Sequence, residues 1–229
     1  MNLTLYHQLL EELKPAGVQL LAVSKTRRPE EIMELFARGQ RDFGENYVQE
    51  LVDKQSRLPT DIRWHFIGHL QTNKVKYIAP FVYMIQGVDS RKLLLEIDKQ
   101  AKKNRRSALC LLQVHIAKEE TNFGFSELEL NDLLQALPGL RSTGQGTDVK
   151  IAGLMGMASL TGNPDQIRQE FRYLRSLFDK VKTMLPEDPV QTLSMGMSGD
   201  YRIAIQEGST MIRIGTALFG ERIYKKEQE

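Results

Sequence analysis

Residues 19–43, QLLAVSKTRRPEEIMELFARGQRDF, contain the unit that decides the fold. The apolar run Gln19–Val23 predicts a buried strand. Residues 29–38 predict a helix, because a proline stands at the start and Glu30 and Glu31 fill the first turn. Residues 41–43 then begin a second strand. A strand, a helix and a strand in this order favour parallel pairing through a crossover.

The same alternation continues along the chain, after a helical segment that ends near Lys14 and Pro15. Segments with strand character lie at 19–23, 41–43, 63–67, 81–88, 108–116, 150–155, 190–194 and 211–215. Each except the last is followed by a helical pattern. Eight such units predict a single (β/α)8 TIM-type barrel domain over residues 1–229, and a doubly wound open sheet is the alternative. Residues 138–148, PGLRSTGQGTD, predict a surface loop within this domain.

Composition limits the class of protein. The 229 residues carry 31 Lys and Arg against 29 Asp and Glu, a net charge of +2, and both signs are interspersed, which argues against a nucleic-acid surface. Apolar runs are far shorter than the roughly 20 residues of a membrane span. The N-terminus has no secretory pattern, so we expect a cytoplasmic protein. Cys110, the single cysteine, lies in an apolar run and is expected to pack in a buried strand.

Lys25 is the first candidate for chemistry. It follows the first predicted strand, and in a barrel the carboxyl ends of the strands build the functional face. A lysine that is desolvated there becomes a nucleophile able to form a Schiff base with an aldehyde or ketone. The alternative is a surface lysine that extends its charge into solvent.

A phosphate site is predicted after the seventh and eighth strands, where barrels commonly bind this group. Ser194 and Ser198 supply hydroxyl groups, and Gly215 and Thr216 supply backbone amides. Arg213 lies within the eighth strand, and a guanidinium there requires an anionic or acceptor partner. A structural ion pair of Arg213, and glycines that merely form turns, are the alternatives.

The remaining candidates are softer. Asn46, His65 and Met157 follow or end other strands and are placed at the barrel mouth, although Asn46 also suits a helix cap. His65 and His69 are four residues apart but lack the glutamate of a zinc-binding HExxH helix, so we predict no metal site. No Ser-His-Asp triad emerges from the four histidines, which disfavours a hydrolase.

A Schiff-base lysine combined with a phosphate site suits two ligand classes. One comprises the phosphosugar-type keto substrates of aldolases, and the other is pyridoxal 5′-phosphate. Arg213 helps to separate them, because a cation facing the pyridine nitrogen would leave that nitrogen unprotonated and weaken the cofactor as an electron sink.

Several motifs, in order along nearly the whole chain, carry a resemblance to a known family. They are AVSKT at 22–26, FGENYVQE at 43–50, WHFIGHLQTNK at 64–74, GLMGMA at 153–158, SMGMSGD at 194–200 and GSTMIRIGTALFG at 208–220. Together they resemble the pyridoxal phosphate homeostasis proteins (YggS/PROSC type), which are similar to the barrel domain of alanine racemase.

The resemblance implies a (β/α)8 barrel with pyridoxal 5′-phosphate held as a Schiff base on Lys25. It implies that Arg213 faces the pyridine or phosphate side, and that the other site residues surround the phosphate (Ser194, Ser198, Gly215 and Thr216) or lie near the ring (Asn46, His65 and Met157). Many relatives carry a lysine where this chain has Asn122, so a second-lysine role is not expected there.

The function implied by the resemblance is intracellular buffering or carriage of the cofactor, without a dedicated catalytic turnover. Apo pyridoxal phosphate enzymes would be the recipients, and a monomer is expected. Racemase-like enzymes complete their site with a C-terminal domain that brings a tyrosine base, and because nine residues follow Gly220 we expect no such domain here. A racemase or decarboxylase of this fold type, and a Schiff-base aldolase, are the alternatives.

Overall fold

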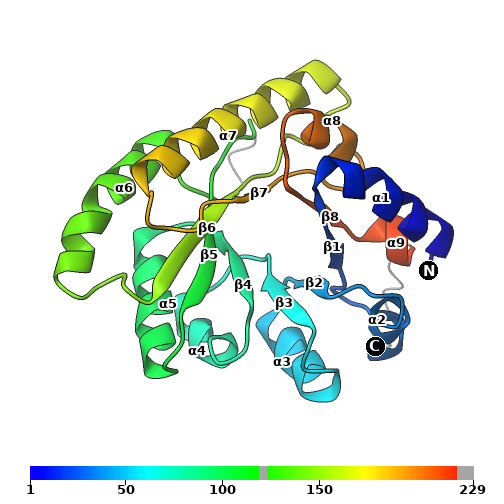
Figure 1. Ribbon diagram of the computed structural model, residues 1–229, viewed down its shortest axis with the longest axis horizontal. Coiled ribbons are helices and arrows are strands. Elements are labelled where there is room, and N and C mark those ends of the chain that lie inside the picture. Colours follow the sequence, from blue (N-terminus) through cyan, green and yellow to red (C-terminus); the bar gives the residue numbers. More distant parts are fainter. Residues whose placement is uncertain (119–122, 221–229) are drawn as a thin grey trace, which may run out of the picture.

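Eight parallel strands close into a barrel in the computed structural model, which describes residues 1–118 and 123–220 (Figure 1). In chain order the strands are β1 (Gln19–Val23), β2 (Asp42–Glu45), β3 (Arg63–Phe66), β4 (Met84–Val88), β5 (Ala108–Gln113), β6 (Val149–Met155), β7 (Thr192–Ser194) and β8 (Met211–Ile214). β8 pairs with β1, so that Leu21 lies opposite Arg213. The predicted barrel is therefore confirmed, and the open sheet is wrong.

Helices lie around the outside of the barrel (Figure 1). They are α1 (Leu3–Ala16), α2 (Pro29–Phe36), α3 (Val48–Arg57), the 3-10 turn η1 (Thr72–Lys74), α4 (Val75–Ile78), α5 (Arg91–Lys103), α6 (Glu127–Ser142), α7 (Pro164–Met184), α8 (Tyr201–Gln206) and α9 (Thr216–Phe219). Of those described, none has the length and apolar character needed to cross a bilayer. Asn122, where no second-lysine role is expected, lies outside the described residues.

α7 shows why these segments fold as they do. Pro164 occupies the first turn, and the side chain of Asn163 accepts hydrogen bonds from the backbone N–H groups of Asp165 and Gln166. Apolar residues at helical spacing are buried against the barrel: Ile167, Phe171, Leu174, Leu177, Phe178 and Val181. The amphipathic pattern in the sequence is thus the face that covers the sheet.

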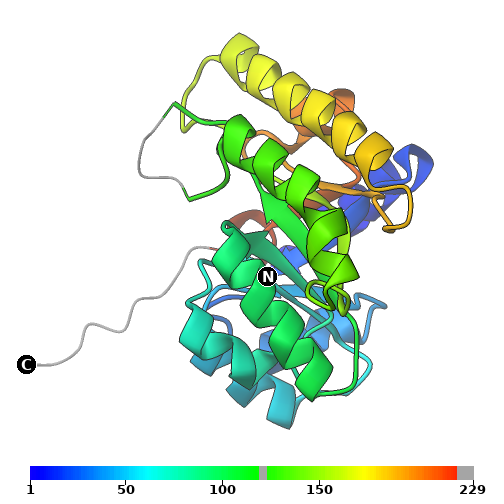
Figure 2. The ribbon, with the colours of Figure 1, turned by 90° about the vertical axis from the view of Figure 1, so that its left-hand side faces the viewer.

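Residues 138–148 differ from the predicted loop, because α6 continues through Ser142. The buried stripe Leu130, Leu133, Leu134 and Leu137 holds the helix against the barrel, while Pro138 and Gly139 lie on its exposed side. Figure 2 shows α6 and α7 side by side, and the Tyr173 hydroxyl donates to Glu127 across them at 2.8 Å. The segment that remains loop, 143–148, is tied to α5 by Asp98, which accepts from the N–H groups of Gly146 and Asp148.

Cys110 lies in β5 and is fully buried, as its apolar setting predicts. Burial raises the pKa of its thiol far above the usual range. The residue is therefore an inert packing element.

Candidate functional site

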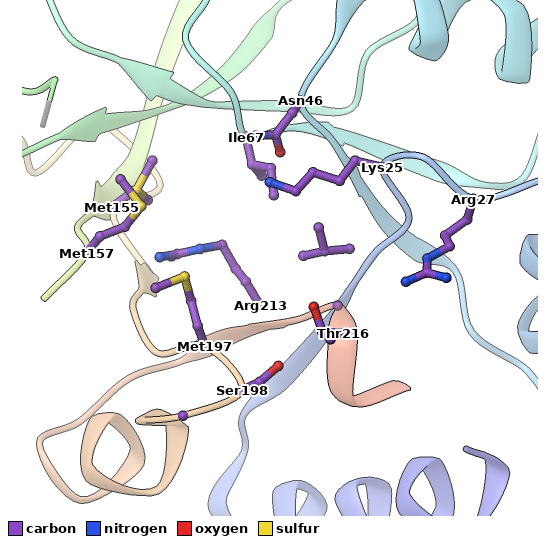
Figure 3. A pocket seen from close by; sticks show the side chains of 13 residues that line it. Lys25, Arg27, Asn46, Ile67, Met155, Met157, Met197, Ser198, Arg213 and Thr216 are labelled. Carbon is purple, nitrogen blue, oxygen red and sulfur yellow. The ribbon is translucent and has the colours of Figure 1, made fainter. Parts of the chain in front are cut away.

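A cavity of about 290 Å³ opens at the carboxyl ends of the strands (Figure 3). Its walls come from β1, β2, β3, β6, β7 and β8 and the loops that follow them. The lining residues are Val23, Lys25, Arg27, Asn46, Ile67, Met155, Met157, Met197, Ser198, Gly199, Arg213, Gly215 and Thr216. The volume is near the lower end of the roughly 300–1,000 Å³ that small-molecule sites occupy.

Lys25 extends into this cavity from the loop after β1, with its ammonium end beside Ile67 (Figure 3). The side chain is half-buried. The loop is short and tied to the barrel, because Ser24 donates its N–H to the backbone oxygen of Gly44 and its own backbone oxygen accepts from the N–H of Arg27. The backbone on both sides of Lys25 is therefore fixed to the barrel rim.

Asn46 follows β2 directly and does not cap α3, whose cap residue is Tyr47. Its side chain lies next to Lys25 in the cavity wall (Figure 3). Within residues 1–118 and 123–220, the buried amide oxygen of Asn46 has no hydrogen-bond partner. A buried polar atom without a partner is uncommon and marks a position where a ligand can donate.

Arg213 is buried in β8 and reaches across the cavity toward Met155 and Met157 (Figure 3). Its guanidinium donates to the backbone oxygen and the hydroxyl of Ser194, both at 2.8 Å, and to the backbone oxygen of Gly156 at 3.0 Å. Burial lowers the pKa of Arg213 to about 10, and the nearby carboxylate of Asp200 opposes that change. Arg213 thus brings a positive charge into the cavity on neutral acceptors, not in a direct ion pair.

The opposite wall consists of small residues and hydroxyl groups, with Ser198 and Thr216 facing the cavity in Figure 3. α9 begins at Thr216, and the N–H groups of Leu218 and Phe219 donate to the backbone oxygen of Gly215 at 2.9 and 3.0 Å. A Cβ added at Gly215 would lie 3.3 Å from the Cβ of Val23, so glycine lets this turn pack tightly against β1. Such a wall suits an anion.

Ser194 and His65 do not line the cavity. Ser194 is buried beneath Arg213, and its hydroxyl donates to the side-chain oxygen of Gln86 at 2.7 Å. The nitrogen of Gln86 contacts Nδ1 of His65 at 3.0 Å, and Nε2 of His65 contacts Asp42 at 3.0 Å. A polar chain therefore runs through the barrel interior from Arg213 to Asp42.

His65 lies near the Asp42 end of this series of hydrogen bonds, and it lines a separate pocket at the amino ends of the strands. Burial lowers the pKa of His65, while Asp42 opposes that change, so the ring is neutral at physiological pH. Placement near the cavity therefore holds for seven of the residues singled out in the sequence, Lys25, Asn46, Met157, Ser198, Arg213, Gly215 and Thr216, and not for Ser194 or His65.

Sequence reasoning missed several parts of the site. Ile67, Met155 and Met197 line the cavity, and each lies within a motif that carries the family resemblance, but as apolar residues near strand ends they suggest no chemistry by themselves. Gln86 was detectable, because an amide in the middle of an apolar strand requires buried partners. Arg27 also lines the cavity, and its guanidinium donates to the backbone oxygens of Phe219 and Gly220.

Known proteins resemble the chain over almost its whole length. The family model described as "Alanine racemase, N-terminal domain" matches residues 5–223. The pyridoxal phosphate homeostasis protein of Pasteurella multocida (strain Pm70) is 38% identical over 96% of this chain and 94% of its own. That of Aquifex aeolicus (strain VF5) is 42% identical over 90% of this chain and 88% of its own.

A solved structure agrees with both findings. PipY of Synechococcus elongatus PCC7942, in the form with PLP bound, superposes with a TM-score of 0.83 at 38% identity, covering 94% of this chain and 98% of PipY. The strand order, the cavity at the carboxyl ends of the strands and these similarities lead to one assignment. The chain belongs to the family of the pyridoxal phosphate homeostasis proteins, built on the barrel of the alanine racemase N-terminal domain.

Proposed function

We propose that this protein binds pyridoxal 5′-phosphate as a Schiff base on Lys25 and acts in intracellular homeostasis of the cofactor, as a buffer or carrier. The observation that carries the proposal is the joint lining of one cavity by Lys25, the Arg213 guanidinium, and a hydroxyl- and glycine-rich wall. The relatives named for this homeostasis and the PLP-bound PipY structure support it.

The residues present fit the cofactor. Ser198, Gly215 and Thr216 would hold the phosphate, which needs several donors and close backbone approach. Met157 and Ile67 offer apolar surface for the ring. Ser194 would act indirectly, by fixing Arg213. His65 would act only through its hydrogen bond with Gln86, which in turn accepts from Ser194.

The cofactor would supply an electrophilic aldehyde and a ring that can withdraw electrons. The ammonium group of Lys25 must lose a proton to act as a nucleophile. Arg213 has donors only, so it can donate to a ring nitrogen but cannot support its protonation. An Arg213 facing the ring nitrogen would thus weaken the ring as an electron sink, which disfavours reactions that leave a carbanion at Cα.

The first test is the absorbance spectrum of freshly purified protein, followed by borohydride reduction and peptide mass mapping. We expect visible absorbance and a reduced adduct at Lys25, both lost in Lys25→Ala. Lys99→Ala removes an ammonium group that is 73% exposed on α5 and serves as the control. A protein that stays colourless after incubation with pyridoxal phosphate would contradict the proposal.

Carrier and enzyme are separated by isotope exchange. A buffer or carrier shows no sustained solvent-deuterium exchange at Cα of amino acids, whereas a racemase or decarboxylase of this fold type does. Exchange that is abolished by Lys25→Ala would favour the enzyme. We further propose that the protein is a single-domain, cytoplasmic monomer that supplies the cofactor to apo pyridoxal phosphate enzymes. Light scattering tests the monomer, and a transfer assay with such an enzyme tests the supply of cofactor.

A further inference from the structure

The turn that carries Lys25 has an unusual backbone. Thr26, the next residue, has φ of 65° and is one of two non-glycine residues with positive φ among those described. A β-branched residue rarely adopts this conformation, because its side chain crowds the backbone. Thr26 therefore remains there only if its surroundings hold it.

A carboxylate on the neighbouring helix α3 holds it. Oε1 of Glu50 accepts a hydrogen bond from the backbone N–H of Thr26 at 2.6 Å. The same oxygen accepts from Nζ of Lys54, one turn further along α3, at 2.7 Å. Glu50 thus ties the residue that follows Lys25 to α3.

The N-terminal side of Lys25 is held by the same ammonium group. Nζ of Lys54 donates to the backbone oxygen of Ser24 at 2.7 Å and to Oε1 of Glu45 at 2.7 Å. The hydroxyl of Ser24 donates to the same oxygen of Glu45 at 2.6 Å. Both residues that flank Lys25 are therefore fixed by one cluster, Glu45, Glu50 and Lys54.

The burial of this cluster argues for a role beyond stability. Lys54 is 3% exposed and Glu45 is fully buried. Removing such charges from water is costly, and an apolar pair of similar size commonly stabilises a fold as well. What an apolar pair cannot do is donate to the backbone oxygen of Ser24, as Lys54 does, and accept from the Ser24 hydroxyl, as Glu45 does.

We propose that Glu50 and Lys54, supported by Glu45, are positioning residues that hold the strained turn 24–26 so that Lys25 points into the cavity. The role of Lys25 in this statement rests on the proposed function. The cluster itself touches no ligand; it acts through the backbone on both sides of Lys25.

The test compares Glu50→Ala, which removes the acceptor of Thr26, with Glu50→Gln, which keeps an oxygen there. In the protein without cofactor, the rate of reductive methylation at Lys25 is measured by mass spectrometry relative to Lys99. We expect the same ratio in the parent protein and in Glu50→Gln. In Glu50→Ala the ratio changes about fivefold or more, because the turn relaxes and no longer holds Lys25 in the cavity.

Titration with pyridoxal phosphate is the second readout, with an expected loss of affinity of about tenfold in Glu50→Ala. Thr26→Gly added to Glu50→Ala restores part of both readouts, because glycine adopts positive φ without strain. Asp53→Ala, which removes an exposed carboxylate from the same helix, changes neither. Lys54→Met removes the donor to the backbone oxygen of Ser24 and serves as an independent variant if Glu50→Ala folds poorly.

Glu50→Ala and Lys54→Met proteins with parental methylation ratios would overturn the proposal. A parent protein that takes up no cofactor would refute the proposed function instead, and the methylation ratio would still decide the role of the cluster. Loss of stability without a change in the ratio would assign the cluster to folding alone and equally overturn the proposal.

Discussion

Asp42 shows how much of the barrel's polar interior depends on single residues. Burial disfavours its charge, but hydrogen bonds from Arg63 and His65 outweigh that effect and lower the pKa of Asp42 to about 2. Arg63 binds it through Nε at 2.8 Å and through a second nitrogen at 2.5 Å. The carboxylate therefore lies at the amino end of the barrel, where it is the last member of the series of hydrogen bonds that begins at Arg213.

We expect Asp42→Asn to lower the free energy of unfolding by about 2 kcal/mol at pH 7. A carboxyl with a lowered pKa stabilises the fold above its unfolded pKa of 3.8, and this contribution is lost as the pH falls from about 4 through 2. Urea unfolding at pH 7 and at pH 2 measures the difference, which should fall to less than about 0.5 kcal/mol at the lower pH. Asp53→Asn, in an exposed pair with Arg57, should change stability by less than about 0.5 kcal/mol.

The residue scale also marks the limit of what sequence can predict. A charged side chain at a strand end or within a strand needs a chemical reason, which makes Lys25 and Arg213 candidates, and both line the cavity. His65 was placed at the wrong mouth, because alternation along β3 does not reveal how deep in the barrel a side chain lies. The cluster that holds Thr26 left no trace in the sequence, since it depends on the packing of α3 against β1 and β2.

Among the elements, the short strands and amphipathic helices were predictable from local pattern. Strand β2 has four residues and β7 three, and both were found because they repeat a unit with a helix between strands. α6 was cut short in the prediction because Pro138 and Gly139 are read as helix breakers. Tertiary packing of Leu134 and Leu137 outweighs that local preference.

The amino end of α7 offers a prediction at this scale. Asn163→Ala removes the acceptor of two backbone N–H groups and should cost about 1 kcal/mol of stability. For a domain of this size that corresponds to a fall in Tm of about 2–4 °C. Thermal unfolding measures it, and Asn163→Asp, which keeps an acceptor, should leave Tm nearly unchanged. An unaltered Tm in Asn163→Ala would show that water replaces the cap without loss.

At the scale of the whole molecule, cofactor binding and folding are linked. Pyridoxal phosphate at about one hundred times its dissociation constant should raise the free energy of unfolding by about 2.7 kcal/mol. The expected rise in Tm is about 5–10 °C, and Lys25→Ala should lose most of it. Pyridoxamine phosphate, which carries the same phosphate and ring but no aldehyde, separates covalent attachment from phosphate binding. Equal shifts in the parent and Lys25→Ala proteins would contradict a covalent role for Lys25.

The chain through the barrel interior gives a second prediction at this scale. Gln86→Leu leaves the Ser194 hydroxyl and Nδ1 of His65 without their partner in a buried region. We expect a loss of about 1–3 kcal/mol in the free energy of unfolding, measured in urea. Because Ser194 also holds Arg213, the affinity for pyridoxal phosphate should fall as well. A destabilised variant that keeps the parental affinity for pyridoxal phosphate would show that Arg213 is held in place without the contact between Ser194 and Gln86.

The direction of the hydrogen bonds in that chain limits which amino acids position 86 tolerates. Arg213 can only donate, so the Ser194 hydroxyl accepts from Arg213 and donates its own hydrogen bond to the side-chain oxygen of Gln86. The side-chain nitrogen of Gln86 then donates to His65. A side-chain amide of this length accepts at its oxygen and donates at its nitrogen, whereas a carboxylate has no donor, and asparagine is one methylene too short. In a library of all substitutions at position 86, we therefore expect glutamine to be preferred, with glutamate disfavoured despite its near-identical shape.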